Sequence, residues 1–343
     1  MSRTIKTGLV GFGKVAETMH APLIQQEPLL DLIAVVERHH EKSKEDYPQV
    51  TVYKSLEAML EQSDVELVVI CTPNEWHFLQ AKAALEAGKH VVVDKPITVN
   101  SSEAEALVKL ANEKGLVLTA YQNRRLDGDF QTIQKMLSEK VLGNIVHFES
   151  HFDRFRPEPN HNWREKEVPG SGILYDLGAH LIDQALILFG QPKWVYAEIL
   201  KQREGVDADD FFDITMMYAH TKVRLTASIL MNAKLPKFLV LGDKGSYSKF
   251  GLDVQEAALK AGIVPGGEGW GEEPESGWGE VFLAHETYPY PTLKGDYPAY
   301  YKNIAMVLNG KEALLVQAEE AIQTLKIIEA AQQSHVEGRR IYM

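Results

Sequence analysis

The sequence predicts an α/β protein with two domains: a doubly wound α/β domain at residues 1–122, and an α+β domain with an open, mostly antiparallel sheet at residues 123–343. Three observations support this. The chain has 343 residues, whereas a single hydrophobic core stops growing at about 250–300 residues. Before residue 122, short β-branched runs alternate with helical segments. After it, longer runs alternate between polar and apolar residues, as antiparallel strands with one exposed face do.

In the first domain, the predicted strands are short and almost entirely apolar, as strands buried on both faces are. They are Ile5–Val10, Leu32–Val36, Glu66–Cys71, His90–Val93 and Leu116–Ala120. Helical spacing separates them at Ser55–Gln62, Phe78–Ala87 and Ser102–Lys114, the last with Ser101 or Ser102 as a candidate N-cap. Because parallel neighbours need crossover connections that helices usually supply, this alternation predicts a parallel sheet.

In the second domain, the predicted strands are longer and half exposed. They are Ile145–Phe155, Val195–Gln202, Phe211–Tyr218, Lys222–Met231 and Lys237–Gly242. Helices are predicted at Asp129–Ser138, Gly178–Phe189, Tyr297–Leu308 and Leu315–Gln333, and the terminal helix is a candidate for packing back on the first domain. The stretch Gly262–Gly279 is glycine-rich and acidic, which predicts a surface loop.

Charge and composition exclude several classes of function. With 36 basic and 48 acidic side chains the formal net charge is −12, which argues against nucleic acid or anionic membrane as a partner. The single cysteine, Cys71, excludes an intrachain disulfide and a cysteine-rich metal site. The N-terminus has no signal-peptide pattern, and no apolar stretch approaches the roughly 18–20 residues that span a bilayer. We therefore expect a soluble, cytoplasmic protein.

A possible metal site lies on one predicted strand. Four side chains alternate along it and share one face: His147, Glu149, His151 and Asp153. A solvated or interface face of an open sheet explains this spacing equally well, and nothing else in the sequence demands a metal. We predict no metal site.

A glycine-rich segment follows the first predicted strand directly and has the pattern G-x-G-x-x-A. It reads Gly11-Phe12-Gly13-Lys14-Val15-Ala16. In this pattern the first glycine permits a tight turn, the second lets a pyrophosphate approach the backbone, and a small third residue lets helix and strand pack closely. The helix N-terminus offers free N–H groups to the phosphates. At the first strand–helix junction of a β-α-β unit, the segment predicts a Rossmann domain that binds NAD or NADP.

The tip of the second predicted strand carries both kinds of cofactor-selecting residue. Glu37 could bind the two ribose hydroxyls of NAD, whereas Arg38 could hold the 2′-phosphate of NADP. Glu37 would repel that phosphate unless it turned away. The alternative for Arg38 is that it only stacks on the adenine. The sequence therefore leaves the choice between NAD and NADP open.

Two further motifs carry chemistry. Asp94-Lys95-Pro96 follows the fourth predicted strand, where the carboxyl ends of parallel strands face the ligand crevice. The Lys95 ammonium could stabilise a developing alkoxide. Asp176 and His180 are four residues apart, so on a helix they share a face. A histidine with a carboxylate neighbour is a usual general base for an alcohol proton.

Together these motifs resemble the Gfo/Idh/MocA oxidoreductases over nearly the whole chain. The match lies in the GFGKVA loop, in Thr72-Pro73-Asn74 with His77, in Asp94-Lys95-Pro96 and in the Asp176–His180 pair. Asp94 replaces the glutamate of many members and leaves the lysine in place. The segments Tyr121–Arg125, Glu149–Pro157 and Tyr175–His180 are similar to the subgroup that contains NADP-dependent scyllo-inositol dehydrogenases.

The resemblance implies a role for each matching residue. Lys95 orients the substrate and touches the nicotinamide ribose, His180 exchanges the hydroxyl proton, and Asp176 binds a substrate hydroxyl. Thr72, Asn74 and His77 lie along the ribose and nicotinamide. The second domain brings Trp163 and Arg164 to the carboxamide, while Tyr121 and Asn123 border the substrate pocket.

The resulting hypothesis is an NAD(P)-dependent dehydrogenase that acts on a C–OH or C=O of a cyclic polyol or sugar, with an inositol as the best single guess. An NAD-dependent glycosidase on the same fold is the alternative enzyme. A non-catalytic dinucleotide-binding regulator is the third reading, although Lys95, Asp176 and His180 are all present. The resemblance also implies a homodimer or homotetramer that covers the open sheet.

Overall fold

The computed structural model describes residues 2–343 and divides into two compact units. The first unit comprises residues up to Asn123 together with Gln255–Trp270 and Asp296–Ile322. The second comprises Arg124–Val254, Gly271–Gly295 and Gln323–Met343. The chain thus returns twice to the first unit, which a single boundary at residue 122 does not describe. The terminal helix is divided between the units, with its larger part in the second.

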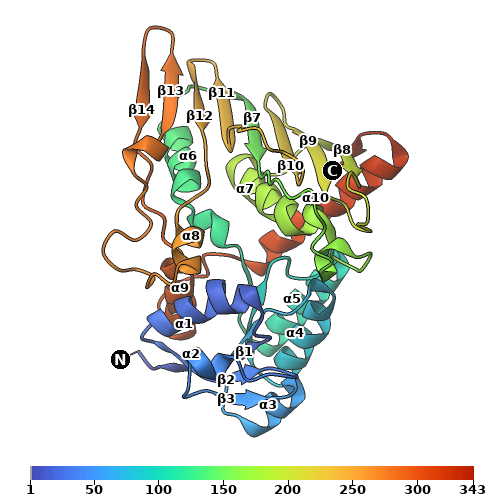
Figure 1. Cartoon of the computed structure of the whole chain (residues 1–343), viewed down its shortest axis with the longest axis vertical. Helices are drawn as coiled ribbons and strands as arrows, with labels where there is room; N and C mark the ends of the chain where they lie inside the picture. The colour runs from blue at the N-terminus through green and yellow to red at the C-terminus, as the bar shows by residue number, and fades with distance from the viewer. Residues whose placement is uncertain (1) are drawn as a thin grey trace. The chain divides into compact units, whose positions relative to one another are not determined.

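The first unit is a Rossmann domain built on a six-stranded parallel sheet (Figure 1). The strand order is β3-β2-β1-β4-β5-β6, the arrangement of a doubly wound dinucleotide-binding fold. Every pair in this sheet is parallel. The strands are β1 (Ile5–Val10), β2 (Leu30–Val36), β3 (Thr51–Tyr53), β4 (Leu67–Ile70), β5 (His90–Asp94) and β6 (Leu118–Tyr121). The predicted fold of this half is confirmed.

Helices flank this sheet, since β4 and the centre of β5 are fully buried and both faces must be covered. One group comprises α3, α4 and α5, and another comprises η1, α1, α8 and α9, which contact one another. The helical segments of this unit are η1 (Ala16–His20), α1 (Ala21–Gln26), α2 (Ser43–Asp46), α3 (Leu56–Gln62), η2 (Asn74–Trp76), α4 (His77–Glu86), α5 (Ser101–Lys114), α8 (Gln255–Lys260) and α9 (Pro298–Leu308). The short segment η3 (Asn123–Leu126) begins at the last residue of this stretch and continues into the second unit.

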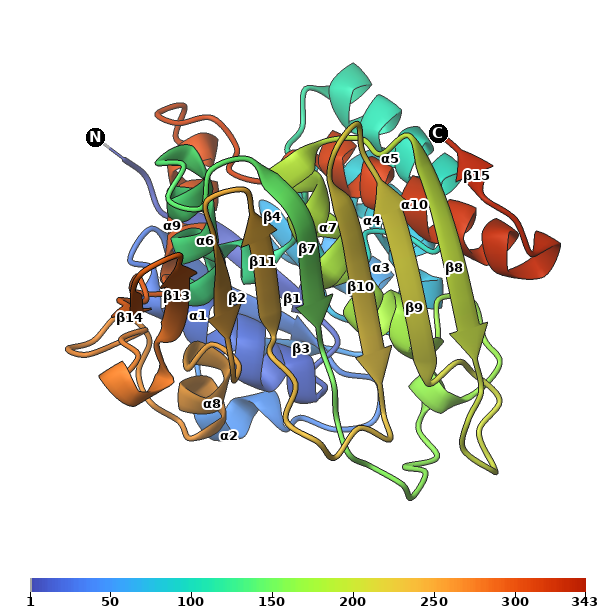
Figure 2. The same ribbon diagram turned by 90° about the horizontal axis from the view of Figure 1, so that it is seen from above.

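The second unit is an α+β domain whose open sheet has nine strands in the order β14-β13-β12-β11-β7-β10-β9-β8-β15 (Figure 2). Only the β7–β10 pair is parallel among the described strands of this sheet. The strands are β7 (Ile145–His151), β8 (Trp194–Leu200), β9 (Phe211–Met217), β10 (Lys222–Ser228), β11 (Phe238–Gly242), β12 (Gly245–Lys249), β13 (Gly279–Leu283), β14 (Thr287–Tyr290) and β15 (Ile341–Tyr342). The predicted open, mostly antiparallel sheet is confirmed.

The helices of the second unit lie on one face of this sheet, as Figure 2 shows for α7 behind β7 and β10. Side chains on that face are buried, for example Phe148, Phe212 and Leu225. Alternate residues face the other way and are partly exposed, which is the pattern of a sheet covered on one side. The helical segments are α6 (Gly128–Ser138), η4 (Trp163–Glu165), η5 (Leu174–Gly178), α7 (Ala179–Phe189), η6 (Glu275–Gly277) and α10 (Ala318–Glu337).

The structure corrects two local expectations. The N-cap of α5 is Asn100, whose side-chain oxygen accepts a hydrogen bond from the N–H of Glu103 at 2.9 Å, rather than Ser101 or Ser102. The predicted strand Ile145–Phe155 ends as regular structure at His151. Among residues 2–343, no helix combines the length and apolarity needed to cross a bilayer.

Candidate functional site

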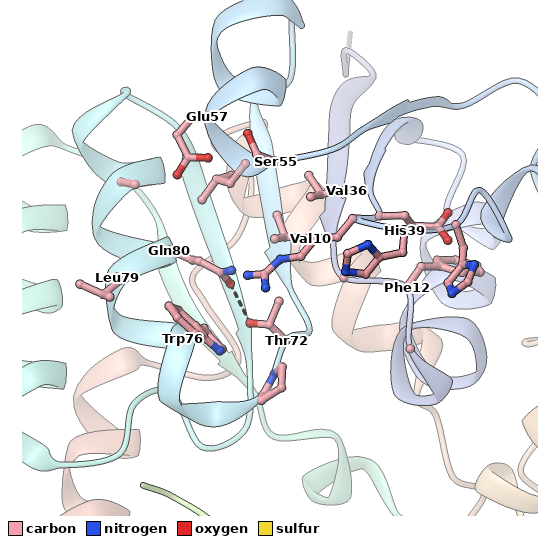
Figure 3. Close-up of a pocket in the computed structure, with 18 residues that line it drawn as sticks. Val10, Phe12, Val36, His39, Ser55, Glu57, Thr72, Trp76, Leu79 and Gln80 are labelled. Atoms are coloured by element: carbon pink, nitrogen blue, oxygen red, sulfur yellow. Dashed lines mark hydrogen bonds between the residues drawn. The ribbon is translucent and has the colours of Figure 1, made fainter. Parts of the chain in front are cut away.

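A cavity of about 550 Å³ lies at the carboxyl ends of β1, β2 and β4 in the first unit (Figure 3). This is the edge where ligands bind in open parallel sheets. It contains seven residues that the sequence assigned to the cofactor: Gly11, Phe12, Gly13, Glu37, Arg38, Thr72 and Pro73. Three segments distant in sequence thus line one cavity large enough for part of a dinucleotide.

The glycine loop has the backbone that its motif requires. Gly11 has a φ of +85°, and a Cβ added there would lie 3.2 Å from the Thr72 side chain. A Cβ at Gly13, in contrast, would meet nothing within 4 Å. The space beside Gly13 is therefore open for a ligand to approach the backbone, which fits a pyrophosphate. Lys14 and Val15 complete the turn into η1 but are not among the residues lining the cavity.

The carboxylate of Glu37 accepts hydrogen bonds from neighbouring protein groups. One oxygen accepts the N–H of Lys42 at 3.0 Å, and the other accepts the N–H of Ser43 at 3.0 Å and its hydroxyl. These donors lie at the start of α2, and the Glu37 residue is only 8% exposed. A carboxylate has about four acceptor sites, so these three bonds engage most of the acceptor capacity of Glu37.

Arg38, in contrast, is exposed and lies over an aromatic ring. Its guanidinium carbon is 5.7 Å from the centroid of the Trp76 ring. His39, His40 and Ser55 line the same part of the cavity. The tip of β2 therefore presents one cation and several hydrogen-bonding groups, with the neighbouring acid turned inward.

On the opposite wall, Thr72 donates its hydroxyl hydrogen to Gln80 Oε1 at 2.7 Å, a bond drawn in Figure 3. Trp76 and Gln80 were not predicted from the sequence. The available signal is helical spacing, because Trp76, Gln80 and Ala83 occur at i, i+4 and i+7 directly after the Thr72-Pro73-Asn74 segment, and all three line the cavity.

His77, which is expected along the ribose and nicotinamide, lies between two backbone carbonyl groups. It is fully buried, with Nδ1 2.8 Å from the Pro96 carbonyl oxygen and Nε2 2.9 Å from the Thr72 carbonyl oxygen. Burial lowers the pKa of His77, and its neutral ring has one N–H to donate, so it hydrogen-bonds one of these two carbonyl oxygens. His77 thus lies between the loop after β4 and the loop after β5. Asn74 is also buried, at the start of η2.

Asp94 forms a buried polar network directly before Lys95. His20 Nε2 lies 3.5 Å from Asp94 Oδ1, and His20 Nδ1 is 2.6 Å from the Tyr301 hydroxyl. Burial opposes ionisation of Asp94, but the hydrogen bond and charge of His20, with Lys95 and His77, hold its pKa below the usual range. The shorter acid at this position is thus supported by a histidine from η1. Lys95 is partly exposed at the end of β5.

Tyr121, which the resemblance places at the border of the substrate pocket, is buried in the core of the first unit. Its residue exposure is 2%, and its hydroxyl donates to the Met19 carbonyl oxygen at 3.0 Å. The ring packs against His20, with centroids 4.2 Å apart, and against Tyr300 at 4.9 Å. Asn123, also assigned to that pocket, is 4% exposed.

In the second unit, Asp176 and His180 lie on one continuous helical segment. Asp176 belongs to the π-helical turn η5, and His180 to the first turn of α7. The segment packs against β9 and β10 because its apolar residues Leu174, Leu177 and Leu181 are buried. Asp176 remains partly exposed, whereas His180 is 7% exposed.

Two arginines face the Asp176 carboxylate. Arg154 Nη1 lies 3.4 Å from Oδ2, and Arg164 Nε lies 3.5 Å from Oδ1. Arg164 also lies over the Trp163 ring, with its guanidinium carbon 4.6 Å from the centroid. A small cavity of about 50 Å³ is lined by Asp176, both arginines and Asp209. The second unit thus brings Asp176, Trp163 and Arg164 into one polar cluster.

The four alternating residues considered as metal ligands, three on β7 and Asp153 just beyond it, form a chain of polar contacts. His147 Nε2 is 2.8 Å from Glu149, His151 Nε2 is 3.4 Å from Glu149, and His151 Nδ1 is 3.5 Å from Asp153. Within residues 2–343, no group of three or more histidine, cysteine or acidic side chains is arranged to hold a metal ion.

Family models match both halves of the chain. Residues 5–122 match the NAD-binding Rossmann fold of the Gfo/Idh/MocA oxidoreductase family, and residues 134–343 match its C-terminal alpha/beta domain. These ranges agree with the change of architecture seen along the chain.

Similar proteins cover nearly the full length. The chain is 44% identical to the uncharacterized oxidoreductase YdgJ of Escherichia coli, with 96% of each chain aligned. It is 38% identical to IolW of Bacillus subtilis, an NADP-dependent scyllo-inositol 2-dehydrogenase, covering 99% of this chain and 96% of that protein. The solved structure of the oxidoreductase yvaA from Bacillus subtilis superposes with a TM-score of 0.96 at 37% identity, covering 100% of this chain and 99% of the other.

Proposed function

Because the chain belongs to the Gfo/Idh/MocA family of NAD(P)-dependent oxidoreductases, we propose that it is an NADP-dependent dehydrogenase of a cyclic polyol or sugar, with an inositol-type substrate. One observation carries the cofactor choice: Glu37 is committed to the start of α2 while Arg38 remains exposed in the cavity. The name of the IolW relative, which specifies scyllo-inositol and NADP, supports the substrate class.

The dinucleotide would be held by the cavity of the first unit. Gly11 and Gly13 let the pyrophosphate reach the start of η1, and Thr72 and Pro73 form the opposite wall. The Arg38 guanidinium would bind the 2′-phosphate in charge-assisted hydrogen bonds. When bound, the nicotinamide supplies hydride chemistry at a carbinol or ketone carbon.

The chain's own residues would supply proton transfer and orientation. Lys95 would hold the reacting oxygen with its ammonium group, which stabilises negative charge developing there. His180 would take the hydroxyl proton during oxidation and return it during reduction. Asp176 would accept a hydrogen bond from a neighbouring substrate hydroxyl, and its carboxylate lies beside Arg154 and Arg164.

The test is absorbance at 340 nm with NADP and with NAD, separately, against inositols, aldoses, glycosides and the matching ketones. We expect a rise with NADP and at least one inositol or sugar, and a smaller rate with NAD. Confirmed NADP binding without any redox change across the panel would contradict the proposal. Release of a glycosidic alcohol without net reduction of cofactor would instead favour the glycosidase reading.

The open face of the second unit's sheet supports self-association into a homodimer or homotetramer. It carries partly exposed apolar side chains among charged ones, including Tyr196 at 36%, Leu200 at 41% and Phe282 at 38% exposed. Light scattering coupled to size-exclusion chromatography tests this. We expect a multimer for the native chain and a shift toward monomer for Tyr196→Glu, whereas a monomeric native chain would contradict the proposal.

A further inference from the structure

The helical segment that carries Asp176 and His180 is anchored at its first residue by a single acidic residue. Asp209 Oδ2 accepts the N–H of Leu174 at 2.8 Å, and the Asp209 carbonyl oxygen accepts the N–H of Ile173 at 3.0 Å. These two N–H groups belong to the first turn of η5, where a helix lacks internal acceptors. Asp209 itself lies two residues before β9.

The neighbouring backbone is shaped around this carboxylate. Gly172 has a φ of +84°, and a Cβ added there would lie 1.9 Å from Asp209 Oδ1. Any larger residue at position 172 would thus displace the Asp209 side chain or the helix start, besides straining the left-handed backbone. Gly172 therefore leaves the space in which the Asp209 carboxylate accepts hydrogen bonds at the beginning of the helix.

We propose that Asp209 is a positioning residue for the reaction: through the first turn of η5 it fixes the orientation of Asp176 and His180. This rests on the proposed function, since it assigns the helix to catalysis. Asp209 also lines the same small cavity as Asp176, so its charge acts on the polar cluster that would bind the substrate.

The charge of Asp209 changes in an accessible pH range. Burial raises its pKa to about 6 and the charge of Asp210 adds to this, although hydrogen bonds from Leu174 and Ile173 favour the ionised form. The other charged groups that line the cavity are Arg154, Arg156, Arg164, Glu165, Asp176 and Arg203. Arg203 is already paired with Glu165 and Asp210 at 3.0 Å each, and Asp176 with two arginines.

The variants are Asp209→Asn, which keeps an oxygen acceptor for Leu174 but removes the charge, Asp209→Ala, which removes both, and Gly172→Ala, which displaces the acceptor. Asp207→Asn is the matched control, because this carboxylate lies in the same loop but is exposed. We expect kcat to fall about tenfold in Asp209→Ala and Gly172→Ala, in line with a lost charge-assisted bond. In Asp209→Asn the fall in kcat should be smaller, about threefold at pH 8, and NADP affinity should stay within about twofold in every variant.

The pH profile separates positioning from general stability. Protonated aspartate resembles asparagine, so the ratio of kcat between native protein and Asp209→Asn should be about threefold at pH 8 and approach one below pH 5. Dividing the two profiles cancels titrations that both proteins share. A ratio that is constant with pH would overturn the proposed role of the charge.

Hydrogen–deuterium exchange of residues 173–181 gives a readout that does not depend on substrate. We expect faster exchange of these amides in Asp209→Ala than in the native protein, partial restoration in Asp209→Asn and no change in Asp207→Asn. Unchanged exchange in Asp209→Ala would overturn the inference. Faster exchange in a protein without dehydrogenase activity would contradict the proposed function and leave the anchoring intact.

Discussion

Glu37 accepts two hydrogen bonds from Ser43, one from its backbone N–H at 3.0 Å and one from its hydroxyl. These bonds fasten the tip of β2 to the start of α2 and engage the Glu37 carboxylate with protein donors, although Glu37 still lines the cofactor cavity. Arg38 is then the charged residue of that tip that faces a ligand. The sequence leaves open whether Glu37 or Arg38 selects the cofactor, and these local hydrogen bonds of Glu37 favour Arg38.

Arg38→Ala should raise the KM for NADP by at least about tenfold, because a charge-assisted contact to the 2′-phosphate is lost. The KM for NAD should change by less than about twofold, since NAD has no such phosphate. Steady-state kinetics with each cofactor measures this. Equal effects on both would show that Arg38 only stacks on the adenine.

Gly13→Ala should leave thermal stability unchanged and weaken dinucleotide binding, because its Cβ would lie in open space where the pyrophosphate approaches. Gly11→Ala should reduce both, since Gly11 has a φ of +85° and the added atom would press on Thr72. Calorimetric titration with NADP and a thermal melt of each variant provide the comparison. If Gly13→Ala bound NADP with native affinity, this result would contradict the assignment of the glycine loop to the binding site.

His180→Ala and Lys95→Ala should each lower kcat by at least about 100-fold, the effect of losing an acid–base or charge-stabilising group. Binding of NADP, followed by quenching of protein fluorescence, should remain close to native in both. Near-native turnover in both variants would contradict the assignment of catalytic residues.

A buried ion cluster directly before β11 should contribute strongly to the stability of the second unit. Lys237 Nζ lies 3.0 Å from Asp127 Oδ2 and 2.7 Å from Asp129 Oδ2, and all three side chains are at most 3% exposed. Lys237→Met would leave two buried acids without their shared cation, which costs about 3–5 kcal/mol of unfolding free energy.

The matched control is Lys6→Met, which removes an exposed lysine paired with Asp64 at 3.0 Å. It should change the unfolding free energy by less than about 1 kcal/mol. Urea denaturation of both variants measures the difference. Similar small losses would show that the buried acids find other partners.

Local sequence signals predict the elements that position the cofactor. Leu67–Ile70 and the centre of β5 are apolar because both faces of a parallel sheet are covered, and this pattern is visible in the sequence. Two strands on one side of the second unit's sheet, β12 and β14, were missed for a physical reason. β12 is half polar, and β14 contains Pro289, which is tolerated at a sheet edge but argues against a strand in sequence.

The roles of Tyr121 and His77 could not be read from local sequence. Tyr121 is buried by Tyr300 and Tyr301, which are about 180 residues away in the chain and belong to a returning helix. The ring nitrogens of His77 lie near backbone carbonyl oxygens of two separate loops. Family motifs locate such residues near a site, but they do not distinguish a residue that contacts the ligand from one that holds the surrounding loops in place.

The most direct test of the central claim uses scyllo-inositol with deuterium on its carbinol carbons, incubated with NADP and the native protein. Mass spectrometry of the recovered cofactor then reports whether hydride has moved. We expect reduced cofactor that has gained one deuterium, together with an inositol ketone, and neither product with His180→Ala in the same time. Unlabelled or unreduced cofactor, with this substrate and with labelled sugars, would contradict a polyol or sugar dehydrogenase.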